Sequence, residues 1–253
     1  MRPSLFLLPA LLSLACTTAQ ARTLTEIKAS GTINVATSAD FEPFNFMRSG
    51  VPVGFEVEVA EAVARQMGLR VNWVIRPFDG LLKDVNERSD IDLVIASHAV
   101  NSTRLKQVDF TTPHYCTGGV ILTRKGGPTT TKALKGQKLG AEGGSTYFSF
   151  LRKLPFEKSV QVYPSSLAVT TAVATGQVKA IVTDRFAAIE AQKNFPKAGL
   201  VLGDILWKEQ IAMAVAKDNL ALRDAVNAAL KQVGVNGTTA HLSTKYFGQN
   251  IGC

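Results

Sequence analysis

Two oppositely charged residues stand where an α/β chain would place a ligand. Arg104 follows an apolar stretch at residues 91–95 and a polar loop at 96–103, and Asp184 ends a second apolar stretch at 179–183. Both stretches indicate buried strands, and open α/β sheets bind ligands at the carboxyl ends of strands. A guanidinium grips a carboxylate through two parallel hydrogen bonds, and a carboxylate can hold an ammonium. The pair therefore predicts a site for a zwitterion.

Both residues also have plainer interpretations. An Arg after a strand and loop is commonly an ion-pair partner on the surface. Asp184 precedes a predicted helix that starts at Arg185, which makes it a candidate N-cap. Capping and ligand binding are compatible, so the sequence leaves both roles of Asp184 open.

Alternating strand and helix patterns surround the two residues. Residues 32–38, 70–75 and 91–95 indicate strands separated by helices, and the same alternation restarts after residue 136. A last strand near residues 207–217 precedes two C-terminal helices. This order is typical of α/β folds in which helices cover a sheet.

Two successive α/β units predict two lobes, each a mainly parallel sheet covered by helices. Residues 111–123 and roughly 207–214 are the candidates for two strands that cross between the lobes. Lobe 1 then comprises residues 22–115 and 211–253, and lobe 2 comprises residues 116–210.

The N-terminus indicates export. Residues 4–15 are apolar over the length of a signal-peptide core, whereas a membrane span needs roughly 20 residues. An Ala-x-Ala sequence ends at Ala21, so we expect a cleavable signal peptide at residues 1–21 and a periplasmic mature protein. We favour this over a lipid anchor on Cys16, because Ser13 stands where a lipoprotein signal would carry Leu.

Charge and histidine patterns argue against two other kinds of site. The mature chain has 27 basic and 20 acidic residues, a formal charge of +7, but its basic residues are scattered, which argues against nucleic-acid binding. His98, His114 and His241 lack partners at metal-ligand spacing, so we expect no metal and no cofactor. Glu56 and Glu58 alternate with Val on a predicted helix, and we expect them to be solvated.

Several segments, in order, resemble one known family. GTINVATSADFEPFNF is similar to its opening strand and Phe/Tyr-x-Pro-Phe segment, and VGFEVEVAEAVARQMG to its Gly-Phe-Asp helix. RSDIDLVIASHAVNSTRLKQVDFTTPHY is similar to its strand, Arg loop and hinge entry, and LKGQKLGAEGGST, TGQVKAIVTD and VNGTTAHLSTKYFG to its later segments. Together they resemble the periplasmic solute-binding proteins of polar amino-acid ABC transporters, family 3. The resemblance implies a two-lobed periplasmic-binding-protein fold of type II.

The resemblance also implies roles for residues at matching positions. Arg104 aligns with the Arg that binds the ligand α-carboxylate, and Thr146 with a second donor to that group, at a helix start where anions bind. Asp184 aligns with the acid that binds the α-ammonium. Phe41 stands where an aromatic covers the ligand, and Phe78 at another wall position.

Other matching positions are less regular. Ser97 lies on the loop that contacts the α-groups, but Ala99 replaces a usual Ser or Thr, and His98 replaces a usual Met or Leu. Asp40 and Glu142, together with Glu42, are expected to flank the cleft. Asp40 and Glu142 are candidate contacts for a ligand side chain, with exposed loop acids as the alternative.

Cys116 and Cys253 remain after the signal peptide is removed, an even number in an oxidising compartment. Cys253 follows a helix that should pack on lobe 1, and Cys116 lies where the chain should leave that lobe. The sequence leaves two readings open, a disulfide between them or a buried thiol and a free terminal thiol.

Two functions remain. The first is a monomeric binding protein that closes on a free amino acid, polar or cationic, and presents it to an inner-membrane ABC permease; this predicts no catalytic residues. The alternative is a cyclohexadienyl (prephenate/arogenate) dehydratase on the same scaffold, which needs a general acid. Glu142 is the candidate acid, although nothing in its sequence surroundings indicates a raised pKa. A receptor's sensor domain would need a transmembrane segment, for which the sequence has no candidate.

Overall fold

The computed structural model describes residues 21–253. The predicted signal peptide and Cys16 lie outside the described residues, apart from Ala21. Among the described residues no helix has the length and apolarity needed to cross a membrane.

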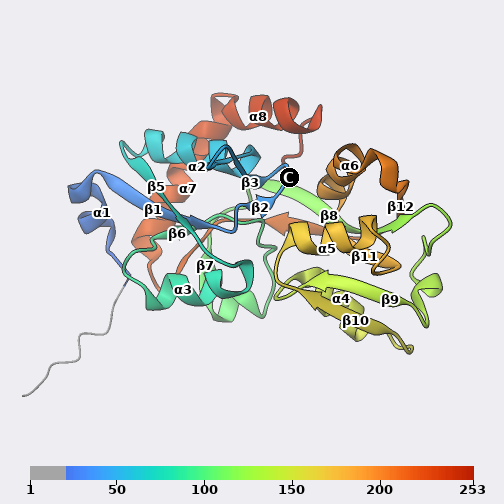
Figure 1. Ribbon diagram of the computed structural model, residues 1–253. Helices are drawn as coiled ribbons and strands as arrows, with labels where there is room; N and C mark the ends of the chain where they lie inside the picture. Colours follow the sequence, from blue (N-terminus) through green and yellow to red (C-terminus); the bar gives the residue numbers. More distant parts are fainter. Residues whose placement is uncertain (1–20) are drawn as a thin grey trace, which may run out of the picture.

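Two five-stranded sheets organise the chain, side by side in Figure 1. The first has the order β5 (Arg70–Ile75), β1 (Thr32–Thr37), β6 (Leu93–Val94), β13 (Ala214–Ala216) and β7 (Val108–Phe110). The second has the order β10 (Ser159–Tyr163), β9 (Lys138–Glu142), β11 (Ala180–Asp184), β8 (Tyr115–Arg124) and β12 (Leu200–Ile211). We call the elements built on the first sheet lobe 1 and those built on the second lobe 2.

Helices cover both faces of each sheet, as Figure 1 shows. In lobe 1, α2 (Phe55–Gln66), α7 (Leu220–Val235) and α8 (Thr238–Phe247) lie on one face, α3 (Leu81–Glu87) lies on the other, and α1 (Leu24–Ser30) precedes β1. In lobe 2, α5 (Ser166–Ala174) and α6 (Arg185–Asn194) lie opposite α4 (Thr146–Lys153). Short 3-10 helices are η1 (Phe78–Gly80), η2 (Arg104–Lys106), η3 (Lys132–Leu134) and η4 (Pro196–Ala198).

Strand β6 shows why both faces carry helices. Leu93 and Ile95 pack into the core under α2 and α7, whereas Val94 between them packs toward α3. Alternate residues of a strand point to opposite faces, so a continuous apolar run is what a sheet covered on both sides requires.

Parallel pairing is less frequent than the sequence predicts. In lobe 1, β1 pairs parallel with β5 and β6, but β13 pairs antiparallel with β6 and β7. In lobe 2, β9 pairs parallel with β10 and β11, but β8 pairs antiparallel with β11 and β12. The antiparallel half of each sheet arises because β8 leaves lobe 1 and β12 returns to it, so the two run in opposite directions.

A third, small sheet was not predicted. It consists of β2 (Asp40–Phe41), β3 (Asn45–Arg48) and β4 (Val51–Val53). The helix α5 of lobe 2 packs against β2, so this sheet contributes to the contact between lobes.

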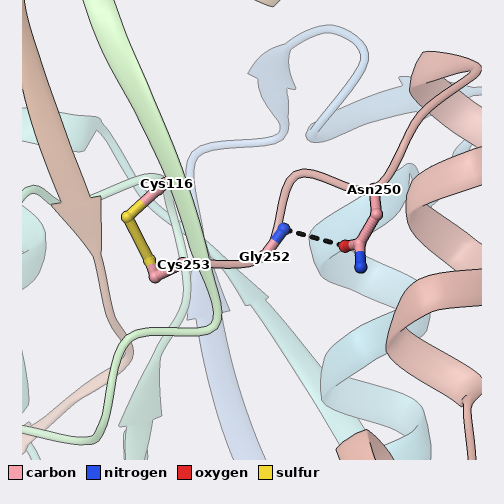
Figure 2. The surroundings of a disulfide bond; sticks show 4 residues. All are labelled: Cys116, Asn250, Gly252 and Cys253. Atoms are coloured by element: carbon pink, nitrogen blue, oxygen red, sulfur yellow. Dashed lines mark hydrogen bonds between the residues drawn. A yellow bond between two sulfur atoms is a disulfide. The ribbon is translucent and has the colours of Figure 1, made fainter.

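The disulfide is present and joins Cys116 to Cys253, with 4.9 Å between the Cα atoms (Figure 2). The backbone N–H of Cys116 also donates to the carbonyl of Ile251 at 2.8 Å, and Ile251 is buried in the lobe 1 core. Gly252 N donates to Asn250 Oδ1 at 2.9 Å. The C-terminal tail is therefore fixed to the first residues of the crossing strand β8.

Candidate functional site

A small cavity lies between the lobes and collects six of the residues singled out in the sequence: Phe41, Phe78, Ser97, Arg104, Glu142 and Thr146. Ser38, Ala96, Ser145 and Tyr147 complete its wall. Its volume is about 20 Å³, so the lobes are closed around it. A wider groove beside it shares Arg104, Phe78 and Thr146 and has lysines on its rim.

Hydrogen bonds between the lobes hold this closed arrangement. Arg104 Nη2 donates to the carbonyl of Gly144 at 3.1 Å, and Asn194 Nδ2 donates to Glu42 Oε2 at 2.8 Å. Ser166 N, at the start of α5, donates to Asp40 Oδ2 at 3.2 Å. Glu42 is thus a contact between lobes and not part of the cavity wall.

Arg104 is buried without a carboxylate partner. Its side chain is 8% exposed, and its Nη1 donates to the carbonyl of Ala99 at 2.9 Å. Among the described residues, none places a carboxylate within 4 Å of this guanidinium. Burial lowers the pKa of Arg104 from its ordinary value, and the nearby charge of Glu209 opposes this decrease only in part.

Aromatic packing fixes one side of Arg104. Phe78 lies 5.8 Å from the guanidinium carbon, measured to the ring centroid, and stacks on His98 at 4.4 Å between centroids. His98 is 2% exposed, and burial holds the pKa of its imidazole well below the usual value, so the ring is neutral. Within residues 21–253 no three His, Cys, Asp or Glu side chains are grouped for a metal ion.

Glu56 is completely buried, so the expectation that it is solvated was wrong. Its carboxylate accepts hydrogen bonds from Ser97 N at 3.0 Å, Ser97 Oγ at 2.9 Å and Asn45 Nδ2 at 2.8 Å, and lies 3.0 Å from His114 Nε2. Ser97 has a left-handed backbone with φ of 56°, a costly conformation for Ser that these bonds hold in place. Glu56 therefore positions the cavity loop, a role that sequence reasoning missed.

The Gly-Gly-Ser-Thr segment forms the lobe 2 side of the cavity. Ser145, not Thr146, is the N-cap of α4, because its Oγ accepts from Phe148 N at 3.0 Å. Gly144 has φ of 72°, and a Cβ there would lie 3.1 Å from the Asp79 side chain of lobe 1. Glycine thus permits the lobes to touch here, with Thr146 in the first turn of α4 and in the cavity wall.

Asp184 caps α6, as one of its two sequence interpretations predicted. It is 1% exposed, and its Oδ1 accepts from Phe186 N at 2.6 Å and Ala187 N at 3.1 Å, while Thr117 Oγ1 donates to Oδ2. Burial raises the pKa of Asp184 to about 7, and these three donors oppose the rise. It does not line the cavity. The pKa of Tyr147, in the cavity wall, is raised first by burial and then by the charges of Glu209 and Asp184. Asp184 therefore lies near that wall.

Glu142 ends β9 and lines the cavity with a partly buried side chain. Its Oε1 is buried and has no hydrogen-bond partner among the described residues. Burial, followed by the nearby charge of Asp40, raises the pKa of Glu142 to about 8. The sequence around Glu142 contained no indication of this raised pKa. The sequence could not show it, because Asp40 comes from the other lobe.

These features define a two-lobed protein whose closed cleft contains a buried cation and buried acids. The chain matches the model of the bacterial extracellular solute-binding proteins, family 3, over residues 33–249, and it belongs to that family. The L-cystine-binding protein TcyJ of Escherichia coli (strain K12) is 31% identical over 232 residues, which cover 90% of this chain and 87% of that protein.

Two solved structures share the fold. An ancestral arginine-binding protein bound to arginine has a TM-score of 0.82 and 32% identity, and the match covers 86% of this chain and 99% of that one. The ancestral amino acid-binding protein AncCDT-1, described as a precursor of cyclohexadienyl dehydratase, has a TM-score of 0.80 and 27% identity, covering 88% and 98%. The expected family and two-lobed α/β fold are confirmed.

Proposed function

We propose that this chain is the substrate-binding component of an ABC importer and that it binds a free amino acid between its lobes. The family match and relatives named for cystine and arginine binding support an amino acid as the ligand. The residues around the cavity support the same class of ligand independently.

The observation that carries the proposal is a pair of buried opposite charges that do not neutralise one another. Arg104 is 8% exposed and Asp184 is 1% exposed, yet among the described residues neither forms an ion pair. A buried charge is costly unless it is paired. The α-carboxylate and α-ammonium of an amino acid would pair with Arg104 and Asp184 respectively, once the lobes open to admit it.

The remaining wall residues fit the same ligand. Thr146 and Ser97 supply polar groups for the α-substituents, and Phe41 and Phe78 supply apolar surface for a side chain. A ligand held by Arg104 from lobe 1 and Asp184 from lobe 2 stabilises the closed form by contacting both lobes, the condition for ligand-driven closure. The crossing strands β8 and β12 form the hinge, with lobe limits at residues 22–115, 116–210 and 211–253.

The family match supports a periplasmic location as the cellular context of this function. Residues 1–21 act as a cleavable signal peptide and deliver the mature chain to the periplasm, where the disulfide can form. The closed, ligand-bound form is recognised by an inner-membrane ABC permease. The chain acts as a monomer.

One observation favours a second candidate function, the cyclohexadienyl dehydratase. A carboxyl group with a pKa near 8 inside a cleft is protonated at neutral pH, as a general acid must be, and Glu142 has this property. One similar solved structure is named as an amino acid-binding protein that is a precursor of such an enzyme. Binding is favoured because the relatives are named as binding proteins and because the unpaired charges match a zwitterion.

A thermal-shift panel of the twenty amino acids tests the proposal, using protein freed of co-purified ligand. A ligand that binds only the folded state stabilises it by about 2.7 kcal/mol at a hundredfold excess over Kd. For a protein of this size that corresponds to roughly 5–10 °C. We expect at least one amino acid to produce such a shift in the wild type but not in an Arg104→Gln variant. A panel with no shift would refute the proposal.

A further inference from the structure

Glu142 is left without a role once Arg104 and Asp184 are assigned to the α-groups of the ligand. Among the described residues that line the cavity, Arg104 is the only basic side chain and Glu142 the only carboxylic acid. Glu142 comes from the end of β9 in lobe 2, and Arg104 from η2 in lobe 1. No hydrogen bond or ion pair joins the two side chains.

A second carboxylate faces Glu142 across the boundary between lobes. Asp40 is partly buried, its Oδ2 accepts from Ser166 N at 3.2 Å, and its Oδ1 is a buried atom without a partner among the described residues. Asp40 and Glu142 thus each keep one buried oxygen unsatisfied in the closed form. Buried polar atoms of this kind are few in folded proteins and call for an explanation.

The charges around the cavity do not balance with a simple zwitterion. Arg104 is a base, whereas Asp184, Asp40, Glu142 and the buried Glu209, whose charge acts on both Arg104 and Asp184, are acids. Glu142, with a pKa of about 8, stays protonated at neutral pH while no cation lies beside it. A ligand with one carboxylate and one ammonium neutralises Arg104 and Asp184 and leaves the pair of Glu142 and Asp40 without a cation. A second positive charge on the ligand side chain would supply it.

We propose that Glu142, together with Asp40 across the lobe boundary, forms the subsite that selects an amino acid whose side chain ends in a cation. This inference rests on the proposed function. Its geometric basis is the position of Glu142 in the cavity wall and the unsatisfied oxygens of both carboxyl groups.

The subsite also predicts a pH dependence that differs between ligands. Besides Asp40, the groups that face Glu142 are Asp79 on η1, Tyr147 on α4, Tyr163 opposite it on β10, and Arg104 across the cavity. Around a neutral side chain Glu142 keeps its raised pKa, near 8, and closure takes up a proton. Affinity for that ligand then falls as pH rises from about 5 toward 8, by at most about tenfold per pH unit. A cationic side chain keeps Glu142 ionised, so its affinity does not fall.

Titration calorimetry with L-arginine and L-citrulline tests the subsite, because the two ligands have the same length and differ by one positive charge. At about pH 7.5, near neutrality, we expect the wild type to bind arginine more tightly than citrulline. In Glu142→Gln the affinity for arginine should fall by roughly tenfold to a hundredfold, while that for citrulline stays within about threefold and loses its pH dependence. Asp40→Asn should also reduce the ratio of the affinity for arginine to the affinity for citrulline. Glu157→Gln, an exposed acid of the same lobe, is the matched control and should change nothing.

Each outcome bears on the inference. A ratio of arginine to citrulline affinity that is the same in wild type, Glu142→Gln and Asp40→Asn overturns the inference and leaves the proposed function intact. The inference is also overturned if the protein binds neither arginine nor citrulline but binds another amino acid in the thermal-shift panel. No binding of any amino acid overturns the proposed function with it. Thermal unfolding of each variant verifies that it is folded.

Discussion

Replacing Asp184 by Asn measures the electrostatic cost of the site without any ligand. The Asn side chain keeps an oxygen that can accept from Phe186 N and Ala187 N, as Asp184 does in capping α6. Its amide group can donate to Thr117 Oγ1, which now donates to the carboxylate. The substitution therefore removes the charge while leaving the local hydrogen bonds satisfiable.

The expected effect follows from the pKa of Asp184, which is about 7 in the folded protein against an ordinary value of 3.8. Because the folded-state pKa is raised, the folded protein holds a proton that the unfolded chain has released. The contribution of Asp184 to the stability of the wild type therefore falls as pH rises from about 4 through 7 and levels off above that. Between pH 5 and pH 8 the variant should gain about 2.7 kcal/mol relative to the wild type, at 1.36 kcal/mol for each pH unit below the pKa, and most of this gain comes before pH 7. This is an upper limit, since opening of the lobes hydrates the site.

Denaturant unfolding of both proteins at pH 5, 6, 7 and 8 measures this difference, and ionisations common to both cancel. The chosen pH values bracket the raised pKa of about 7. Asp109→Asn is the control: burial raises the pKa of Asp109, but hydrogen bonds from Lys217 and Asp218 N outweigh this and lower it. That variant should be less stable than the wild type by a constant amount over the same range. A gap between Asp184→Asn and wild type that does not widen from pH 5 to pH 7 would refute the reasoning.

Three further predictions concern the disulfide, the buried Glu56 that positions the cavity loop, and the dehydratase reaction. Replacing Cys116 and Cys253 by Ser removes a cross-link between residues separated by 137 positions in the sequence. The entropy of the unfolded chain predicts that this lowers the free energy of unfolding by at most about 5 kcal/mol. A decrease below about 1 kcal/mol in denaturant unfolding would contradict a stabilising role of the disulfide. Glu56→Gln removes a buried charge with four polar contacts and should cost roughly 1–3 kcal/mol, whereas Glu61→Gln on the exposed face of α2 should cost less than about 0.5. Incubation with prephenate should yield no phenylpyruvate, because a dicarboxylate meets one guanidinium and several acids; product that disappears in Glu142→Gln would establish the dehydratase instead.

The sequence predicted the elements around Arg104 well, because their signals are local. The apolar run at residues 91–95 contains β6, and the loop after it brings Arg104 to the cavity. Only Leu93–Val94 are paired as a strand, but the burial of the whole run was read correctly. The N-cap role of Asp184 was also readable, since a cap depends on the next three residues.

Properties that depend on residues distant in the sequence could not be predicted from the sequence. Glu56 follows the alternation expected of a solvated helix face, but its partners lie at Asn45, Ser97 and His114, which only the fold brings together. The raised pKa of Glu142 depends in the same way on a carboxylate from the other lobe. No local sequence pattern links Asn45 to Glu56 or Asp40 to Glu142. The sequence therefore could not predict the burial of Glu56 or the raised pKa of Glu142.

The central claim is that Arg104 binds the α-carboxylate of an amino acid. Calorimetry tests it most directly with four combinations: wild type and Arg104→Gln, each with the amino acid found in the thermal-shift panel and with its α-amide, which lacks the carboxylate charge. Arg152→Gln, an exposed Arg of α4, serves as the control. Each single change should weaken binding by about 2–5 kcal/mol, and the double change should cost little more than either one. Losses that simply add, or wild-type affinity in Arg104→Gln, would contradict the account.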